Sequence, residues 1–351
     1  MSSDKYVAYV GTYTHENSIG IHLYDLDVAN GTMTERKVVP INNPSHLVIS
    51  HSKKYLYSIA DEGVEAFRIL PDGDLKMINH EWIGGMRGCY VDISRDDDFL
   101  FVGGYHDARV SMMRLNTEDG HIEGIADGIF HKGMGRCIAE RSSRPHVNCV
   151  KQTPDRKFLC AVDGGLDHIK IYRVDYEAGK LRNTDILRCQ IDSAPKSMLF
   201  SADGKYAYVL CELLNCVNVY AYSSEDDNPN FEFLQEITTT DPKDDDICSA
   251  SAMTITEDGK YLYVANAGVN SAVIYEIDPE TGMLSLVTNC RISGEFPKAI
   301  EVFPDNQHFV TLNHESNEIC SFAMNYGEKY FVMHGKPCAI DKPNCIAIHK
   351  I

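Results

Sequence analysis

Short apolar runs separated by turn residues recur along the whole chain and predict β-strands. The repeated unit is an apolar strand, an Asp-Gly or Pro-Asp type of turn, and a second apolar strand that ends in small or polar residues. Its clearest copies are PKSMLFSADGKYAYVLCE from Pro195, SAMTITEDGKYLYVANAG from Ser251 and FPKAIEVFPDNQHFVTLNHE from Phe296. Looser copies begin at Pro44, Gly88 and Pro145. Their spacing of roughly 50 residues indicates a repeat architecture.

The two ends of the chain supply the halves of a seventh copy. Pro343–Ile351 (PNCIAIHKI) matches the first strand of the unit, and Lys5–Thr14 (KYVAYVGTYT) matches the second. Further strand candidates between the copies bring each repeat to about four short strands. Radial stacking of four-stranded sheets leaves only short, protected edges. The sequence therefore predicts an all-β, seven-bladed β-propeller, with residues 1–351 as one domain and the last blade closed by the N- and C-terminal strands.

Composition narrows the range of partners and compartments. The formal net charge of −18 disfavours nucleic acid and anionic membranes, because binding to phosphate backbones requires a basic face. No apolar run approaches the length of a membrane helix, and the N-terminus lacks the pattern of a signal peptide. The 12 cysteines form no CxxC pair and no Cys/His metal spacing. Dispersed thiols suit a reducing compartment, so we expect a cytoplasmic protein without a metal site.

The repeat also predicts where polar side chains converge. In an antiparallel hairpin, residues that open the first strand lie beside residues that end the second. If the first strand lines the central channel, both sets surround one mouth of that channel, and the residue types there differ from blade to blade. Polar residues from all seven blades converge there, including His46, Ser251, Asn344 and the candidate site residues Arg87, Tyr105, His146, Asn148, Asp163, Lys196, Glu212, Asn266, Lys298 and His314.

Three of these residues are candidates for catalysis. Glu212 ends an apolar strand, and a partly buried carboxylate suits general acid or base work. His146 titrates in the physiological range, and Lys196 offers a cation for a carboxylate, a phosphate or an oxyanion. Each also has a structural interpretation: Glu212 and Lys196 can form an ion pair within one blade, and His146 can be a hydrogen-bonded turn residue.

The chain resembles the bacterial lactonase family that is typified by the propeller-type 6-phosphogluconolactonase and includes carboxymuconate cycloisomerase relatives. The resemblance rests on VGTYT followed by GIHLYDLD, on RPHVN followed by TPDRKFLCAVD, and on APKSMLFSADGKYAYVLCEL, in this order. It implies a seven-bladed propeller that opens or closes lactone rings without a metal or organic cofactor.

Carried over by position, the family's glutamate falls on Glu212, and its arginine after the mid-chain proline is matched by Lys196. The family's usual Pro-His-x-His motif stands here as Pro145-His146-Val147-Asn148, so the second histidine is replaced. A later arginine of the family pattern is absent, because Ala267 follows Asn266. If the second histidine is essential, these departures alter or remove the activity.

The first hypothesis for function is therefore a cytoplasmic sugar-lactone hydrolase of the pentose phosphate pathway type, acting on 6-phosphogluconolactone or a close relative. Glu212 or His146 would act as the base, Lys196 as oxyanion stabiliser or anion anchor, and Lys298 or Arg87 as a further anchor. The second hypothesis is a non-catalytic propeller that binds a small ligand or a protein loop. The third is a cycloisomerase, whose dicarboxylate substrate would favour the arginines that this chain lacks.

Overall fold

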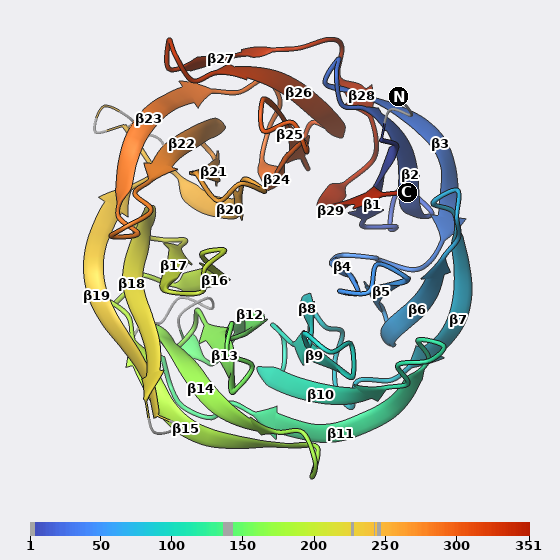
Figure 1. Ribbon diagram of the computed structural model, residues 1–351, viewed down its shortest axis with the longest axis vertical. Helices are drawn as coiled ribbons and strands as arrows, with labels where there is room; N and C mark the ends of the chain where they lie inside the picture. Colours follow the sequence, from blue (N-terminus) through green and yellow to red (C-terminus); the bar gives the residue numbers. More distant parts are fainter. Residues whose placement is uncertain (1–3, 136–142, 226–227, 242, 244–246) are drawn as a thin grey trace.

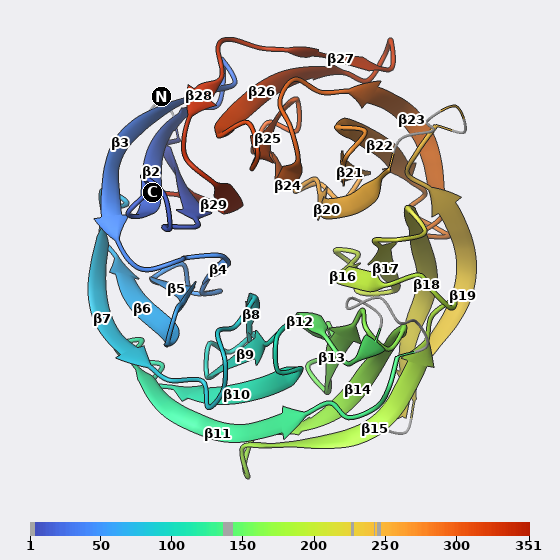
Figure 2. The same cartoon turned by 180° about the vertical axis from the view of Figure 1, so that it is seen from behind.

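The computed structural model describes residues 4–135, 143–225, 228–241, 243 and 247–351. Short strands form seven sheets around a central axis (Figure 1), and the view from behind shows the same closed ring (Figure 2). The first strand of each sheet lies nearest the axis. These inner strands are β29 (Pro343–Lys350), β4 (Leu47–Ile49), β8 (Tyr90–Ile93), β12 (Val147–Gln152), β16 (Pro195–Phe200), β20 (Ser249–Ile255) and β24 (Pro297–Val302).

The second and third strands carry most of the buried side chains. The second strands are β1 (Tyr6–Thr12), β5 (Tyr55–Ala60), β9 (Phe99–Gly103), β13 (Phe158–Asp163), β17 (Tyr206–Cys211), β21 (Tyr261–Ala267) and β25 (His308–Asn313). The third strands are β2 (Gly20–Asp27), β6 (Gly63–Ile69), β10 (Arg109–Leu115), β14 (His168–Asp175), β18 (Cys216–Glu225), β22 (Ser271–Ile277) and β26 (Glu318–Asn325).

The outermost strands are mostly exposed or partly buried, with a buried residue near the start of each, as expected for sheet edges that face solvent. They are β3 (Thr32–Pro40), β7 (Leu75–Glu81), β11 (Ile122–Phe130), β15 (Lys180–Arg188), β19 (Asn228–Thr238), β23 (Leu284–Arg291) and β27 (Tyr330–Met333). The short strand β28 (Cys338–Ala339) pairs with β26 at the edge of the last sheet. Among the described residues, no helix is long and apolar enough to cross a membrane.

The predicted ring closure is confirmed. Strand β29 pairs antiparallel with β1, from Tyr6 opposite Lys350 to Thr12 opposite Pro343. The C-terminal strand is thus the inner strand of a blade whose other three strands come from the N-terminus. This pairing removes two open strand edges, which is the physical advantage that the sequence pattern indicated.

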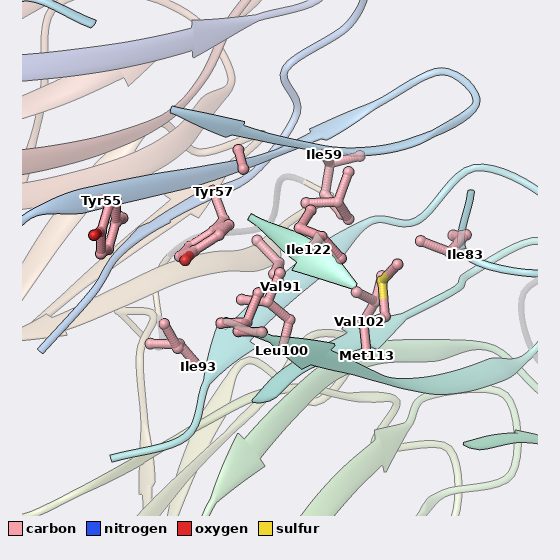
Figure 3. Packing of buried hydrophobic residues seen from close by; sticks show 13 residues of the cluster. Tyr55, Tyr57, Ile59, Ile83, Val91, Ile93, Leu100, Val102, Met113 and Ile122 are labelled. Carbon is pink, nitrogen blue, oxygen red and sulfur yellow. The ribbon is translucent and has the colours of Figure 1, made fainter. Parts of the chain in front are cut away.

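The hydrophobic core lies between neighbouring blades rather than inside any one of them. One cluster joins the β4–β7 sheet to the β8–β11 sheet through fully buried residues such as Tyr57, Ile59 and Leu100 (Figure 3). Because each sheet buries its faces only against its neighbours, the ring has to form as a whole to complete its core.

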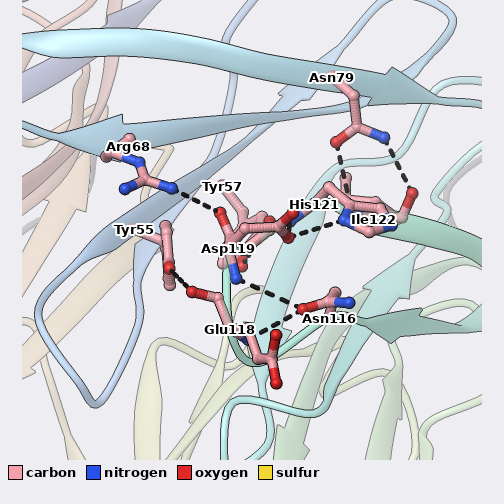
Figure 4. A network of polar contacts seen from close by, with 10 residues as sticks. Tyr55, Tyr57, Arg68, Asn79, Asn116, Glu118, Asp119, His121 and Ile122 are labelled. Atoms are coloured by element: carbon pink, nitrogen blue, oxygen red, sulfur yellow. Dashed lines mark hydrogen bonds and ion pairs between the residues drawn. The ribbon is translucent and has the colours of Figure 1, made fainter.

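Polar contacts fix the angle between the same two blades (Figure 4). The Tyr55 hydroxyl donates to the Glu118 carbonyl at 2.8 Å, and the Tyr57 hydroxyl donates to the Gly120 carbonyl at 3.0 Å. The amide of Asn79 forms two hydrogen bonds with the backbone of Ile122, at 2.9 and 3.0 Å. Tyr55, Tyr57 and Asn79 therefore each have a hydrogen-bond partner in the next blade, which ties these two sheets together.

Candidate active site

A β-bulge recurs at the start of the inner strands and aims one side chain at the channel. The ladder between β16 and β17 passes from Pro195 opposite Cys211 to Ser197 opposite Leu210, so Lys196 is left without a partner. The same irregularity in the β12, β20, β24 and β29 pairings leaves out one residue in each strand. Those residues are Asn148, Ser251, Lys298 and Asn344. A bulge bends the strand and turns the extra side chain out of the ladder.

All five bulge residues line one cavity on the axis, which has a volume of about 960 Å³. Its wall includes residues at the start of β16, such as Lys196, and residues beyond its end, such as Ala202, so the cavity extends along the channel. Among described residues, the wall contains two carboxylates, Glu212 and Glu301, and five cationic side chains. These cations are Arg87, Arg95, Lys151, Lys196 and Lys298. The cavity is thus locally cationic in a protein of net charge −18, which favours an anionic ligand.

Glu212 and Lys196 form an ion pair at the mouth of this cavity. The Lys196 Nζ lies 3.3 Å from Glu212 Oε1, with the two side chains 29% and 18% exposed. The Ser249 hydroxyl donates to the same oxygen at 2.7 Å and comes from the next blade. The Glu212 N–H donates to the Ala194 carbonyl, and the Ala250 N–H donates to the Glu212 carbonyl. These backbone hydrogen bonds fix the turn that carries Glu212. The carboxylate is thereby held in one orientation on the cavity wall, as the side chain of a general base has to be.

His146 lies on the cavity wall of the neighbouring blade. Its Nδ1 is 2.8 Å from the Tyr105 carbonyl oxygen, and the two rings stack with centroids 4.2 Å apart. Because a carbonyl only accepts hydrogen bonds, Nδ1 carries the proton, and in the neutral ring Nε2 has the lone pair. His146 is therefore a second side chain on this wall that can accept a proton.

Two further cations stand beside aromatic rings at the same mouth. Arg87 forms an ion pair with Asp61 at 3.1 Å and lies over the ring of Tyr13 at 5.3 Å. The Lys298 Nζ lies 5.6 Å from the centre of the Phe296 ring. Such contacts restrain long cationic side chains, and both residues line the cavity.

Three of the predicted mouth residues do not belong to the cavity wall of the described structure. Asp163 and Asn266 are fully buried, and His314 is 8% exposed with its Nδ1 3.2 Å from the Pro343 carbonyl. Asn266 hydrogen-bonds Ser271 in its own blade and Thr239, which follows the outer strand of the preceding blade. These side chains satisfy backbone and neighbouring polar groups, which is the usual role of polar residues at strand ends.

Asp163 has a structural role, because it holds the backbone of His146 in position. Its Oδ1 accepts from the backbone N–H of His146 at 2.9 Å and also from Gly165 and Leu166. Its Oδ2 lies 2.6 Å from Nδ1 of His131, which belongs to the preceding blade. Burial raises the pKa of this carboxyl, but the His131 contact and the backbone donors outweigh it and leave the pKa below its usual value. Asp163 is therefore ionised and holds the turn that carries His146.

The cavity wall also carries the ionisable residues Lys151, His46 and Glu301, of which the sequence pattern placed only His46 at the channel mouth. The Lys151 Nζ pairs with Asp92 at 2.8 Å, and His46 stacks on Tyr90 with ring centroids 3.9 Å apart. Burial lowers the pKa of His46 to about 4, so the ring is neutral at pH 7. Glu301 accepts from the Thr254 hydroxyl at 3.2 Å. All but Asp92 lie on the cavity wall. Lys151 and Glu301 stand within β12 and β24, where they look like ordinary alternation in the sequence.

Raising the pH from 5 to 8 is expected to destabilise the folded protein through Glu301. Burial raises the pKa of this carboxyl from 4.5 to about 7, so the folded state keeps a proton that the unfolded state releases. Stability therefore falls as the pH rises between these two values, by at most ~1.4 kcal/mol per pH unit. The Glu301→Gln variant should lack this component when melting temperatures are compared at pH 5, 6, 7 and 8. Equal slopes for wild type and variant would assign the effect to another group.

Comparisons with known proteins agree with this architecture. A family model described as "Lactonase, 7-bladed beta-propeller" matches residues 7–348. The chain is 28% identical to a 6-phosphogluconolactonase of Bacillus subtilis, over 99% of both chains. It is 30% identical to a 6-phosphogluconolactonase of Formosa agariphila, over 90% of this chain and 91% of the relative.

Among solved structures, the periplasmic gluconolactonase of Pseudomonas aeruginosa superposes with a TM-score of 0.91 at 25% identity, covering 98% of this chain and 99% of that one. The family match spans nearly the whole propeller, including the strands that carry Glu212 and Lys196. The chain therefore belongs to the lactonase family of seven-bladed β-propellers.

Proposed function

We propose that the protein hydrolyses a sugar lactone that carries an anionic group, with 6-phosphogluconolactone as the first substrate to test. The observation that carries this proposal is the Glu212–Lys196 pair, oriented by Ser249, at the mouth of a cavity with a cationic wall. The relatives named 6-phosphogluconolactonase and gluconolactonase support the reaction class, that of a carboxylic-ester hydrolase.

The chemistry follows from the ion pair. Glu212 takes a proton from a water molecule, whose oxygen attacks the lactone carbonyl carbon. Lys196 stabilises the negative charge that develops on the carbonyl oxygen. The bond between the carbonyl carbon and the ring oxygen then breaks, and the ring oxygen takes the proton back from Glu212. The product is an open-chain hydroxy acid, and no other reactant is consumed.

Polar groups on the wall support a hydroxylated ligand. Within the part of the chain that the structure describes, the Ser45 and Ser197 hydroxyls and the Asn344 carbonyl oxygen have no hydrogen-bond partner, and all three residues line the cavity. Buried polar atoms are stable when they are paired. The hydroxyl groups of a sugar provide donors and acceptors of the required kind.

Lys298→Ala is expected to separate anion binding from chemistry. If Lys298 anchors a phosphate, the variant should raise KM for 6-phosphogluconolactone about tenfold or more while leaving kcat nearly unchanged. With gluconolactone, which lacks the phosphate, the same variant should behave like the wild type. Both assays require subtraction of spontaneous hydrolysis. An equal loss on the two lactones would exclude Lys298 as a phosphate anchor.

Lys196→Ala is expected to act on the chemical step. Removal of one oxyanion donor lowers kcat by about 100-fold or more in comparable sites. Because the carbonyl oxygen is present in both substrates, the loss in kcat should be similar for the phosphorylated and the neutral lactone. If the variant only raises KM, and only for the phosphorylated lactone, Lys196 binds the phosphate. This is the other role that its position allows.

A cytoplasmic location is also part of the proposal. The 11 cysteines of the described residues are free thiols, which suits a reducing compartment. One structural relative is a periplasmic enzyme, so location differs among propellers of this kind. Detection of the protein in the periplasmic or extracellular fraction of its source cells would contradict the assignment.

A further inference from the structure

A compact group of metal-binding side chains lies outside the cavity, between the third and fourth blades. His131 follows β11 in one blade, whereas Asp163 ends β13 and His168 begins β14 in the next. One ligand atom from each of the three residues lies within 4.8 Å of the others. Two imidazoles and a carboxylate are a donor set that zinc and other first-row divalent metals accept.

The ligand atoms of this group are close enough together for one ion to contact all three. The Nε2 atom of His168 is buried and, within the described chain, has no hydrogen-bond partner. The Oδ1 atom of Asp163 is occupied by backbone N–H groups, which leaves Oδ2 directed at His131. A neutral imidazole nitrogen that is buried without a donor costs free energy, and a metal ion would use its lone pair.

His131 can change from hydrogen-bond donor to metal ligand without losing its other contact. Its Nδ1 now lies 2.6 Å from Asp163 Oδ2, and its Nε2 lies 3.0 Å from the Tyr172 hydroxyl. When a metal replaces the proton on Nδ1, the proton of the neutral ring moves to Nε2 and is donated to the Tyr172 oxygen. A hydroxyl both donates and accepts, so Tyr172 supports either tautomer. A second contact of this kind is typical of metal-bound histidines.

We propose that His131, Asp163 and His168 bind a divalent transition-metal ion of the Zn²⁺ type. The ion is structural: it connects two blades and stands behind the turn that carries His146, while the three ligands lie off the cavity wall. On binding, the ligand atoms of His131 and Asp163 move apart from 2.6 Å to roughly 3.3 Å, the separation of two ligands on a tetrahedral ion. No step of lactone hydrolysis passes through it.

Metal titration of the full chain tests this site. After dialysis against a chelator, wild-type protein should bind one equivalent of Co²⁺ with visible d–d absorption, and Zn²⁺ should displace it. Saturating Zn²⁺ should raise the melting temperature by about 3 °C or more, because the ion binds the folded state. The absence of stoichiometric binding at about 100 µM metal, the range of a weak site, would overturn the proposal.

Two histidine variants locate the binding. His168→Ala removes a ligand whose Nε2 has no other described contact, so the apo protein should fold and melt like the wild type, while Co²⁺ affinity falls by about 100-fold or more. His121→Ala is the matched control: this histidine lies on an exposed turn 2.7 Å from Asp119, and the variant should bind metal as the wild type does. Undiminished binding by His168→Ala, or loss confined to His121→Ala, would refute the site.

Tyr172→Phe adds a test that does not depend on removing a ligand. Without the hydroxyl, the Nε2–H of metal-bound His131 loses its acceptor, so Zn²⁺ affinity should fall by about tenfold. The lactonase activity of the apo protein supplies an independent readout, since it should survive with or without Zn²⁺. If metal affinity is the same in Tyr172→Phe and wild type, the assigned tautomer and its ligand His131 are wrong.

Discussion

The Glu212→Gln variant is expected to lose about 100-fold or more in kcat on 6-phosphogluconolactone, because it keeps the shape of the side chain and removes the proton acceptor. Lys196 and Ser249 hold Glu212 in place at 3.3 and 2.7 Å, and an amide can keep the contact with Ser249. The melting temperature should therefore change little. Initial rates above the spontaneous reaction provide the measurement.

Two comparisons assign the proton acceptor. Glu232→Gln changes an exposed carboxylate on the outer strand β19 and should leave kcat unchanged. His146→Gln tests the other acceptor on the wall, and its effect should be smaller than that of Glu212→Gln. If His146→Gln abolishes turnover while Glu212→Gln retains it, the histidine is the base. A wild-type protein with an intact fold and no activity on either lactone would instead support a ligand-binding propeller.

Deletion of residues 343–351 is expected to abolish the cooperative thermal transition or to lower the melting temperature by ~10 °C or more. The deletion removes β29 together with the buried Cys345, opens β1 as an unpaired edge and exposes the core around Tyr9. Each lost ladder hydrogen bond contributes ~1 kcal/mol net, and the whole fold is stabilised by only about 5–15 kcal/mol. Calorimetry and circular dichroism measure the change.

Lys350→Ala provides the control for this deletion. It keeps the β29 ladder and removes only the ion pair with Asp4, in which both side chains are more than half exposed. Exposed pairs of this kind contribute about 0–1 kcal/mol, so the melting temperature should stay close to that of the wild type. A truncated chain that melts at the temperature of the full chain would show that the N-terminal strands complete the ring without β29.

The fold was predictable because its signal is repeated along the chain. Each copy of the strand, turn and strand unit is weak alone, but six copies and two complementary halves define the number of blades and their closure. The site was less predictable. Glu212 and Lys196 meet because both stand at the channel end of their hairpin, which the repeat shows. Asp163 and Asn266 also end second strands, yet their side chains are fully buried and bond residues of the preceding blade.

The rest of the site depends on distances that no local pattern records. Whether a residue near the start of an inner strand faces the channel depends on the bulge. Nothing in the sequences PKS (195–197) or PKA (297–299) shows that the lysine is the residue that the ladder skips. Glu301 and Lys151 belong to different blades, and their common position on the cavity wall becomes visible only when the ring is closed. The group of His131, Asp163 and His168 likewise joins two blades, because His131 precedes Asp163 by 32 residues and meets it only in the folded ring.

The recurring bulge places five side chains of the cavity wall at positions that the strand ladders skip. Because the ladders skip Asn148, Lys196, Ser251, Lys298 and Asn344, a change of residue type at these positions alters the ligand environment without breaking strand pairing. Five such positions around one opening can change residue type without a change in strand register, although Asn148 and Asn344 also donate to backbone carbonyls of the next blade. Propellers of this family can thus acquire new specificities by point substitution on an unchanged scaffold, and a designer can use the same five positions as a combinatorial library.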